Sequence, residues 1–335
     1  MLLLLLLLVL SATSSSALPA AYDLREQHPE CVALQRLFNQ GACASCCVAA
    51  IATQLSLREC VSLNAAARLY SPQRIWDCAA PFAAGNCSTG VLLDDMIGAM
   101  GTGSRSRRTL MDASCLPAPI LAEKDPNITQ CVSSSNNDSA CGGGEQALLL
   151  GGMATYHLNP YYASLDYVSQ LAARALMNEI YDNGPVVSVL TFRVGSDFTN
   201  FATPGFLRDG RVFMANVSAP PSATVISHCV VVLGWGVDAS SGHPYWLIQN
   251  SYGAQWADGG FARVLRGANL LEGDWRALFV SVPPSSTTPP PASSAVVQLV
   301  GLPNNDIMVL TFLSAIAFAC LLVCVFSPSF LRGFF

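Results

Sequence analysis

The chain has 335 residues, of which 52% are hydrophobic and 12% are charged, and its formal net charge is −5 at pH 7. So apolar a composition with so small a net charge excludes an intrinsically disordered chain. Nucleic-acid binding is also excluded, because the 17 Lys and Arg are outnumbered by 22 Asp and Glu and form no basic stripe. A globular protein, a membrane protein or a combination of the two remains.

The first 17 residues predict a secretory signal peptide. Residues 2–10 are LLLLLLLVL, and small residues follow as far as Ala17. This apolar run is too short to span a hydrocarbon core of about 30 Å, and the small residues after it suit signal peptidase. We therefore expect residues 1–17 to be removed and an ectodomain, residues 18–282, to begin at Leu18.

The first motif that carries chemistry is Gln-Gly-Ala-Cys-Ala-Ser-Cys-Cys at residues 40–47. Apolar residues then recur at helical spacing: Val48, Ile51, Ala52 and Leu55. This pattern predicts an amphipathic helix that begins near Cys46, where unpaired N–H groups favour a thiolate. Cys43 and Cys46 also form a CxxC, but no second CxxC or histidine pair completes a zinc site, and the βαβ context of a redox pair is missing.

A cysteine nucleophile needs a base, and the chain has four histidines. His228 differs from the other three because it opens an apolar run, residues 229–233, which predicts a buried strand ended by the Gly-Trp-Gly at residues 234–236. A second predicted strand, residues 245–248, is followed by Asn250. The amide of Asn250 can hold the imidazole in one tautomer, as the third member of a nucleophile–base–orienter set.

The C-terminal part predicts a membrane anchor. Residues 283–306 begin PPSSTTPPPASSA, a Pro/Ser/Thr tract that behaves as an extended stalk. Residues 307–326 carry no charge and are long enough to cross a bilayer, and residues 327–335, with Arg332, fit a cytoplasmic tail. Two alternatives to the span stay open: a buried core helix, and a lipid-anchor signal with small residues near 304–306.

Thirteen cysteines in a chain that enters the secretory pathway predict disulfides. Cys320 and Cys324 lie in the predicted span, so the ectodomain keeps eleven, an odd number. At least one ectodomain thiol must then stay free or pair between molecules, and we place the free thiol at Cys46. Four sequons agree with a luminal ectodomain: Asn86, Asn127, Asn137 and Asn216.

Taken together, these motifs resemble the papain family of cysteine proteases, and within it they are most similar to cathepsin B. The resemblance covers almost the whole ectodomain. It rests on segments that follow one another in the family's order: residues 18–27, 40–46, 179–185, His228, residues 233–237, 244–247 and 250–251.

The resemblance implies an α+β, papain-like fold of two lobes, a helical lobe with Cys46 and a β-barrel lobe with His228 and Asn250, ahead of the C-terminal transmembrane helix. A peptide would bind between the lobes. The Cys46 thiolate would attack the scissile carbonyl, His228 would protonate the leaving amine, and Asn250 would orient His228. Gln40 and the backbone N–H of Cys46 would form the oxyanion hole. Neither a metal nor a cofactor is implied.

Three departures from the family bear on activity. Cys47 stands where the family has Trp after the nucleophile, and Tyr252 replaces the Trp that shields the His–Asn hydrogen bond. In the substrate-binding segment Ser88-Thr89-Gly90, Thr89 replaces a glycine. None of these changes removes the nucleophile, base, orienter or oxyanion glutamine. We therefore expect an active cysteine peptidase, with an inactive binding or adhesion module on the same fold as the alternative.

Two further departures bear on control and on the mode of cleavage. No inhibitory pro-region separates Ala17 from the mature-like start at Leu18. The stretch 104–144 corresponds to the occluding loop of cathepsin B, whose paired histidines bind the substrate's C-terminal carboxylate, but it contains no histidine. We therefore expect endopeptidase action with little release of C-terminal dipeptides.

The family's positions also imply how the cysteines pair. They imply the disulfides Cys31–Cys60 and Cys43–Cys87. Four cysteines would pair among themselves in an order that the sequence does not fix: Cys78, Cys115, Cys131 and Cys141. The last two, Cys47 and Cys229, flank the catalytic pair, and we expect them to be buried free thiols that fill space rather than a redox switch.

Specificity and partners complete the predictions. In an ungapped alignment Arg276 falls where cathepsin B has an acidic residue in its main specificity pocket, so that basic residues two before the cut would be disfavoured. A one-residue shift, which would leave Arg276 on the surface, is the alternative. We expect a monomer that acts on peptides or proteins. Its catalytic domain would be membrane-anchored and would face the secretory or endolysosomal lumen or the cell exterior.

Overall fold

The computed structural model describes residues 18–80, 83, 85–101, 113, 149–157, 166–193, 195–216, 225–267 and 274–281. They all belong to the first of two compact units, residues 1–296; the second unit is residues 297–335. The predicted signal peptide, stalk, membrane span and cytoplasmic tail lie outside the described residues and stay predictions.

The long helix α3 (Cys46–Leu63) begins at Cys46, as the sequence predicts. Every residue from Cys47 to Cys60 is buried, so the expectation of an amphipathic helix is wrong. The reason is that α3 is covered on all sides, by α4 (Pro72–Ala79), by α5 (Leu93–Met100) and by strands of the sheet. In the described part of the chain α3 is also the one helix long and apolar enough to cross a membrane, but 78% of it is buried inside the protein.

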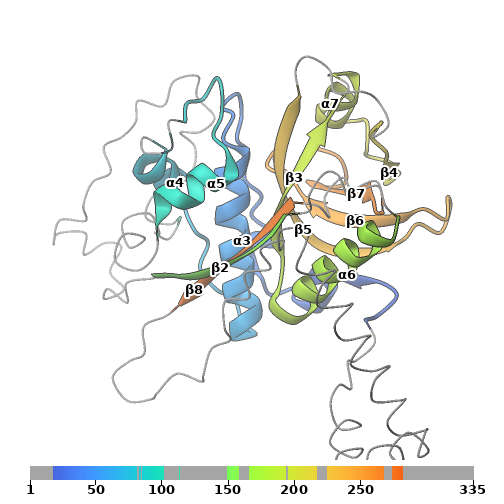
Figure 1. Ribbon diagram of the computed structural model, residues 1–335, viewed down its shortest axis with the longest axis horizontal. Coiled ribbons are helices and arrows are strands. Elements are labelled where there is room, and N and C mark those ends of the chain that lie inside the picture. Colours follow the sequence, from blue (N-terminus) through green and yellow to red (C-terminus); the bar gives the residue numbers. More distant parts are fainter. Residues whose placement is uncertain are drawn as a thin grey trace, which may run out of the picture. The chain divides into compact units, whose positions relative to one another are not determined.

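Eight strands form one sheet next to α3 (Figure 1). Their order is β2 (Leu149–His157), β8 (Asp274–Ser281), β3 (Val186–Phe192), β5 (Ile226–Val237), β6 (Pro244–Gln249), β7 (Phe261–Leu265) and β4 (Val212–Phe213), and β1 (Tyr22–Asp23) pairs with β5. All pairs are antiparallel except β4 with β7. The predicted α+β architecture is confirmed. Among the described strands no pairing joins β4 to β2, so a closed barrel stays a prediction.

Both strands predicted around the candidate base and orienter are present, as β5 and β6. However, β5 does not end at the Gly-Trp-Gly but continues to Val237. Gly234 is needed for a close approach of chains, because a Cβ there would lie 2.2 Å from the Tyr22 carbonyl oxygen of β1. In this strand glycine therefore marks strand pairing and an irregular register rather than an end.

Strand β5 separates two hydrophobic clusters. Cys229, Val231 and Leu233 belong to the cluster around α3, α4 and α5, whereas Val230 and Val232 belong to the cluster next to α6 (Asp166–Asn183) and α7 (Gly195–Ala202). The alternation follows from the period of two in a strand, and burial on both faces explains the unbroken apolar run. In Figure 1, α3, α4 and α5 lie to the left of α6 and α7.

Candidate active site

Cys46 opens α3 and is the one free cysteine among the cysteines that the structure describes. Its side chain is partly buried. Backbone N–H groups of Cys47, in the first turn of the helix, and of Cys229, in β5, are among the groups that lower the pKa of its thiol. Backbone groups of two separate elements therefore favour the thiolate form of the same side chain.

His228 and Asn250 are brought together by the pairing of β5 with β6 and are both buried. The Nε2 atom of His228 lies 2.7 Å from Oδ1 of Asn250, and the same oxygen accepts the backbone N–H of Ser251 at 2.8 Å. Because an amide oxygen only accepts, Nε2 carries the hydrogen of a neutral ring. Nδ1 is then the nitrogen that can exchange a proton with Cys46.

The pKa values of Cys46 and His228 move in opposite directions. Burial opposes ionisation of the thiol, but the charge of His228, a hydrogen bond with its ring and the two backbone N–H groups outweigh it, and the pKa of Cys46 is lowered. Burial also opposes the charged ring, but the charge of Cys46 and hydrogen bonds with Cys46 and Asn250 raise the pKa of His228. Each group thus stabilises the charged form of the other, which favours a thiolate–imidazolium pair.

Aromatic rings enclose His228. The ring of Tyr252 lies 4.9 Å from the His228 ring between centroids, and that of Phe201 lies 5.8 Å from it. The buried Trp256 donates its indole N–H to the Phe201 carbonyl at 2.8 Å and packs on both rings. Burial and the charge of Cys46 raise the pKa of Tyr252, so this phenol stays neutral. The sequence pointed to Tyr252 as the aromatic shield but missed Phe201 and Trp256.

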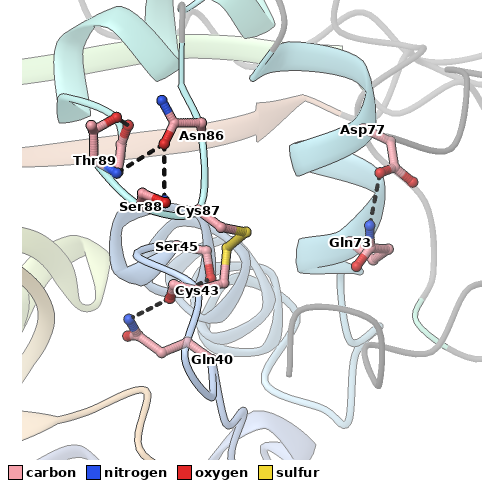
Figure 2. The surroundings of a disulfide bond; sticks show 10 residues. Gln40, Cys43, Ser45, Gln73, Asp77, Asn86, Cys87, Ser88 and Thr89 are labelled. Atoms are coloured by element: carbon pink, nitrogen blue, oxygen red, sulfur yellow. Dashed lines mark hydrogen bonds between the residues drawn. A yellow bond between two sulfur atoms is a disulfide. The ribbon is translucent and has the colours of Figure 1, made fainter. Parts of the chain in front are cut away.

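Gln40 is buried and held by two side-chain hydrogen bonds. Ser251 donates its hydroxyl to Oε1 at 2.5 Å, and Nε2 donates to the Cys43 carbonyl at 2.9 Å (Figure 2). An amide nitrogen has two hydrogens, so one N–H of Gln40 is not needed for the bond to Cys43. The role of Ser251 was missed in the sequence, although it directly follows Asn250.

A cavity of about 680 Å³ lies beside these residues. It is lined by the 40–44 segment, by Cys87 and Ser88, and by Phe198, Ala202 and Tyr252. Gln40 and Tyr252 therefore belong both to the candidate site and to this cavity. Of the predicted substrate-binding residues, only Ser88 lines it.

The Ser88-Thr89-Gly90 segment is fixed against the cysteine motif. The N–H groups of Ser88 and Thr89 both donate to Oδ1 of Asn86 at 2.9 Å, and the Cys43–Cys87 disulfide ties the segment to residues 40–46 (Figure 2). Gly90 has a φ of 75°, and a Cβ there would lie 3.0 Å from a backbone oxygen. Thr89 has no positive φ and is exposed, so the loss of a glycine at this position causes no backbone strain.

Arg276 is buried, so the alternative that placed it on the surface is wrong in that respect. It lies in β8, is 1% exposed, and binds the carboxylate of Asp94 through two contacts of 2.7 Å. The Asp94 side chain is 56% exposed. The positive charge is therefore paired, and repulsion of a basic substrate residue by Arg276 has no support here.

The predicted disulfides Cys31–Cys60 and Cys43–Cys87 are confirmed, and Cys78 is also disulfide-bonded. Cys115, Cys131 and Cys141 lie outside the described residues, so their pairing stays a prediction.

The expectation that Cys47 and Cys229 are free thiols is wrong, because they form a disulfide. Their Cα atoms are 4.8 Å apart, since α3 packs directly on β5. The three sulfurs of Cys46, Cys47 and Cys229 lie within 4.8 Å of one another. This cluster and Glu30 with Cys31 and Cys60 are the groups in the described part of the chain with the spacing of a metal site. Each contains a disulfide, so neither offers a full set of thiolates.

Comparison with known proteins agrees with this geometry. Residues 18–108 and 153–275, more than half of the chain, match the family described as papain family cysteine protease. The chain is 25% identical over 253 residues to a gut-specific cysteine proteinase of Caenorhabditis elegans, which covers 75% of this chain and 70% of that protein. It is 26% identical over 276 residues to cathepsin B-like cysteine proteinase 5 of the same organism, with 76% and 72% covered.

Among solved structures, proCathepsin B S9 from Trypanosoma congolense shares the fold, with a TM-score of 0.56 at 20% identity over 80% of each chain. The chain belongs to the papain family of cysteine proteases, and within it the chain is similar to cathepsin B-like cysteine proteinases.

Proposed function

We propose that the chain is an active cysteine endopeptidase that cuts peptide bonds with a Cys46 thiolate and a His228 imidazolium. The observation that carries this proposal is the pairing at the start of α3. The pKa of Cys46 is lowered by the charge of His228 and by backbone N–H groups against the effect of burial, and the other ring nitrogen of His228 is held by Asn250. Nucleophile, base and orienter thus come from α3, β5 and the end of β6.

In this proposal the thiolate attacks the scissile carbonyl carbon, and the negative charge that develops on the carbonyl oxygen is stabilised by the spare N–H of Gln40 and the backbone N–H of Cys46. Such preorganised donors are typically worth about 3–4 kcal/mol each. His228 then gives its Nδ1 proton to the leaving amine, which leaves an acyl-enzyme on Cys46. Water, deprotonated by His228, hydrolyses this thioester and restores the thiolate.

The peptide would lie along Ser88, Thr89 and Gly90 and extend into the cavity beside Gln40. This placement is supported by the Cys43–Cys87 bridge, which fixes that segment next to the cysteine motif. The alternative is an inactive binding module. We disfavour it because the proposed nucleophile, base, orienter and oxyanion glutamine are all present.

Covalent labelling tests the proposed nucleophile. The full chain, purified in detergent, should react with an epoxide inhibitor of papain-like enzymes at one site, and peptide mapping should locate the adduct on Cys46. The Cys46→Ala variant should fold and remain unlabelled. A correctly folded wild-type chain that takes up no label would support the inactive module instead.

The mode of cleavage follows from residues 104–144, which contain no histidine to bind a substrate's C-terminal carboxylate. We expect the enzyme to cut an internally quenched peptide within its length, at similar rates whether its C-terminus is free or amidated, because no histidine of this stretch then binds a free carboxylate. Mass spectrometry of the products checks this. Efficient, successive release of dipeptides from the free C-terminus only would contradict endopeptidase action.

A further inference from the structure

The Cys47–Cys229 disulfide joins the two residues that directly follow Cys46 and His228, the candidate catalytic pair. Cys47 directly follows Cys46 in the first turn of α3, and Cys229 directly follows His228 in β5. The candidate nucleophile and the candidate base are therefore each one residue away from the same covalent bond. Of the three described bridges, this one alone joins α3 to a strand of the sheet.

We propose that this bridge positions the Cys46 sulfur against the His228 ring, so that Cys47 and Cys229 are positioning residues for the peptidase reaction. The inference rests on the proposed function and adds to it. Helix α3 and strand β5 are separate elements 182 residues apart in sequence at the bridge, and packing alone allows a helix and a strand to slide or tilt. A disulfide that holds the two Cα atoms 4.8 Å apart restricts this movement next to Cys46 and His228, the residues whose distance the reaction depends on.

The bridge also fixes the donors that face Cys46. The backbone N–H groups that help to lower the pKa of Cys46 belong to Cys47 and Cys229, the two bridged residues. Any movement of α3 against β5 would therefore separate the sulfur from His228 and from one of its backbone donors together. Cys47 stands where the papain family has a tryptophan, so here a covalent bond occupies a position that relatives fill with a large packing side chain.

Burial lets the bridge persist while Cys46 stays reduced. Cys47 is 6% exposed and Cys229 is 1% exposed, whereas Cys46 is only partly buried. Since thiol–disulfide exchange requires access to a sulfur, a reductant in solution reaches Cys46 before it reaches the bridge. One site can thus hold a reactive thiol and an intact disulfide side by side.

The test removes the bridge without adding a thiol. Cys47→Ala/Cys229→Ala is made in the full chain, with Cys47→Val/Cys229→Ala as a second variant that fills more of the lost volume. A single replacement is unsuitable because it would leave a new thiol within 4.8 Å of Cys46. The matched control is Cys31→Ala/Cys60→Ala, which removes a buried bridge at the other end of α3.

Two experiments are made. The first measures kcat and KM on an internally quenched peptide, and the second measures the pH midpoint of Cys46 alkylation by iodoacetamide. We expect kcat to fall about 10- to 100-fold in both bridge variants, with KM changed much less, because the ground-state contacts of the peptide are untouched. The midpoint of alkylation should rise toward the ordinary thiol value near 8.5. The control should lose stability but keep the wild-type kcat and alkylation midpoint.

The inference is overturned if a folded bridge variant keeps the wild-type kcat and alkylation midpoint, since the bridge would then only stabilise the fold. It is also overturned if the control shifts the midpoint equally. The wild-type chain could cleave no peptide while its alkylation midpoint still rises when the bridge is removed. That outcome would contradict the proposed function but support the role of the bridge in positioning Cys46.

Discussion

Replacing His228 by alanine is expected to lower kcat/KM roughly 10⁴-fold, the upper end of what a positioned acid–base group contributes. The effect is large because His228 serves twice: its charge lowers the pKa of Cys46 against the effect of burial, and its proton goes to the leaving amine. Without the ring, burial raises the pKa of Cys46 and no imidazolium charge opposes this effect. The thiol would then be neutral at the pH where the wild-type enzyme works.

The sign of the pH effect follows from the two shifts. In the wild-type chain the thiolate is lost as the pH falls through the lowered pKa of Cys46, and the imidazolium is lost as the pH rises through the raised pKa of His228. A plot of kcat/KM against pH should therefore be bell-shaped, with its acid limb below the ordinary thiol value of about 8.5 and its alkaline limb above the ordinary histidine value of about 6.5. In His228→Ala the acid limb of Cys46 alkylation should move to higher pH.

The matched control is His243→Ala, because His243 lies in the turn between β5 and β6 and bonds there through its backbone: its oxygen accepts from Asp238 and its N–H donates to Ser241. This variant should keep wild-type kcat/KM and alkylation. If His228→Ala retained more than a tenth of the wild-type activity, His228 would not be the base, and the thiolate would have to be stabilised by the backbone N–H groups alone.

The parts of the site that the sequence predicts are those encoded by neighbouring residues. The start of α3 at Cys46 follows from the helical spacing after it, and β5 and β6 follow from their apolar runs. Adjacent antiparallel strands then bring His228 and Asn250 together, although they are far apart in sequence. The hydrogen bond between His228 and Asn250 therefore follows once the two strands are predicted.

The parts that the sequence does not predict depend on packing between distant elements. An odd number of cysteines is compatible with three free thiols or with one, and only the contact of α3 with β5 decides that Cys47 and Cys229 are bonded. Arg276 is neutralised by Asp94 because β8 and α5 come together, which no local pattern encodes. The even burial of α3 has the same origin, since helices and strands from later in the chain cover its outer face.

Stability should depend most strongly on Arg58, a buried cation that ties α3 to the segment between α6 and β3. It is 4% exposed, forms an ion pair with Glu179, and donates to the carbonyls of Pro185 at 2.7 Å and Gly184 at 3.0 Å. Glycine suits position 184, because its φ is 94° and an added Cβ would lie 3.4 Å from the Arg58 side chain. We expect Arg58→Met to lower the free energy of unfolding by about 3–5 kcal/mol, because it leaves the Glu179 carboxylate, whose side chain is only 14% exposed, without its cation and two carbonyls without their donor.

Urea denaturation measures this loss, and two further variants separate its causes. Arg58→Lys keeps the charge but not the planar fork, so it should fall between the wild type and Arg58→Met. Arg211→Met breaks the pair between Arg211 and Asp209, whose side chains are 57% and 52% exposed, and should leave the unfolding midpoint unchanged, because solvent already screens that pair. If Arg58→Met were no more destabilising than Arg211→Met, packing alone would hold α3 to this segment. In that case the Cys47–Cys229 bridge would have to account for a larger share of the contact between the helix and the sheet.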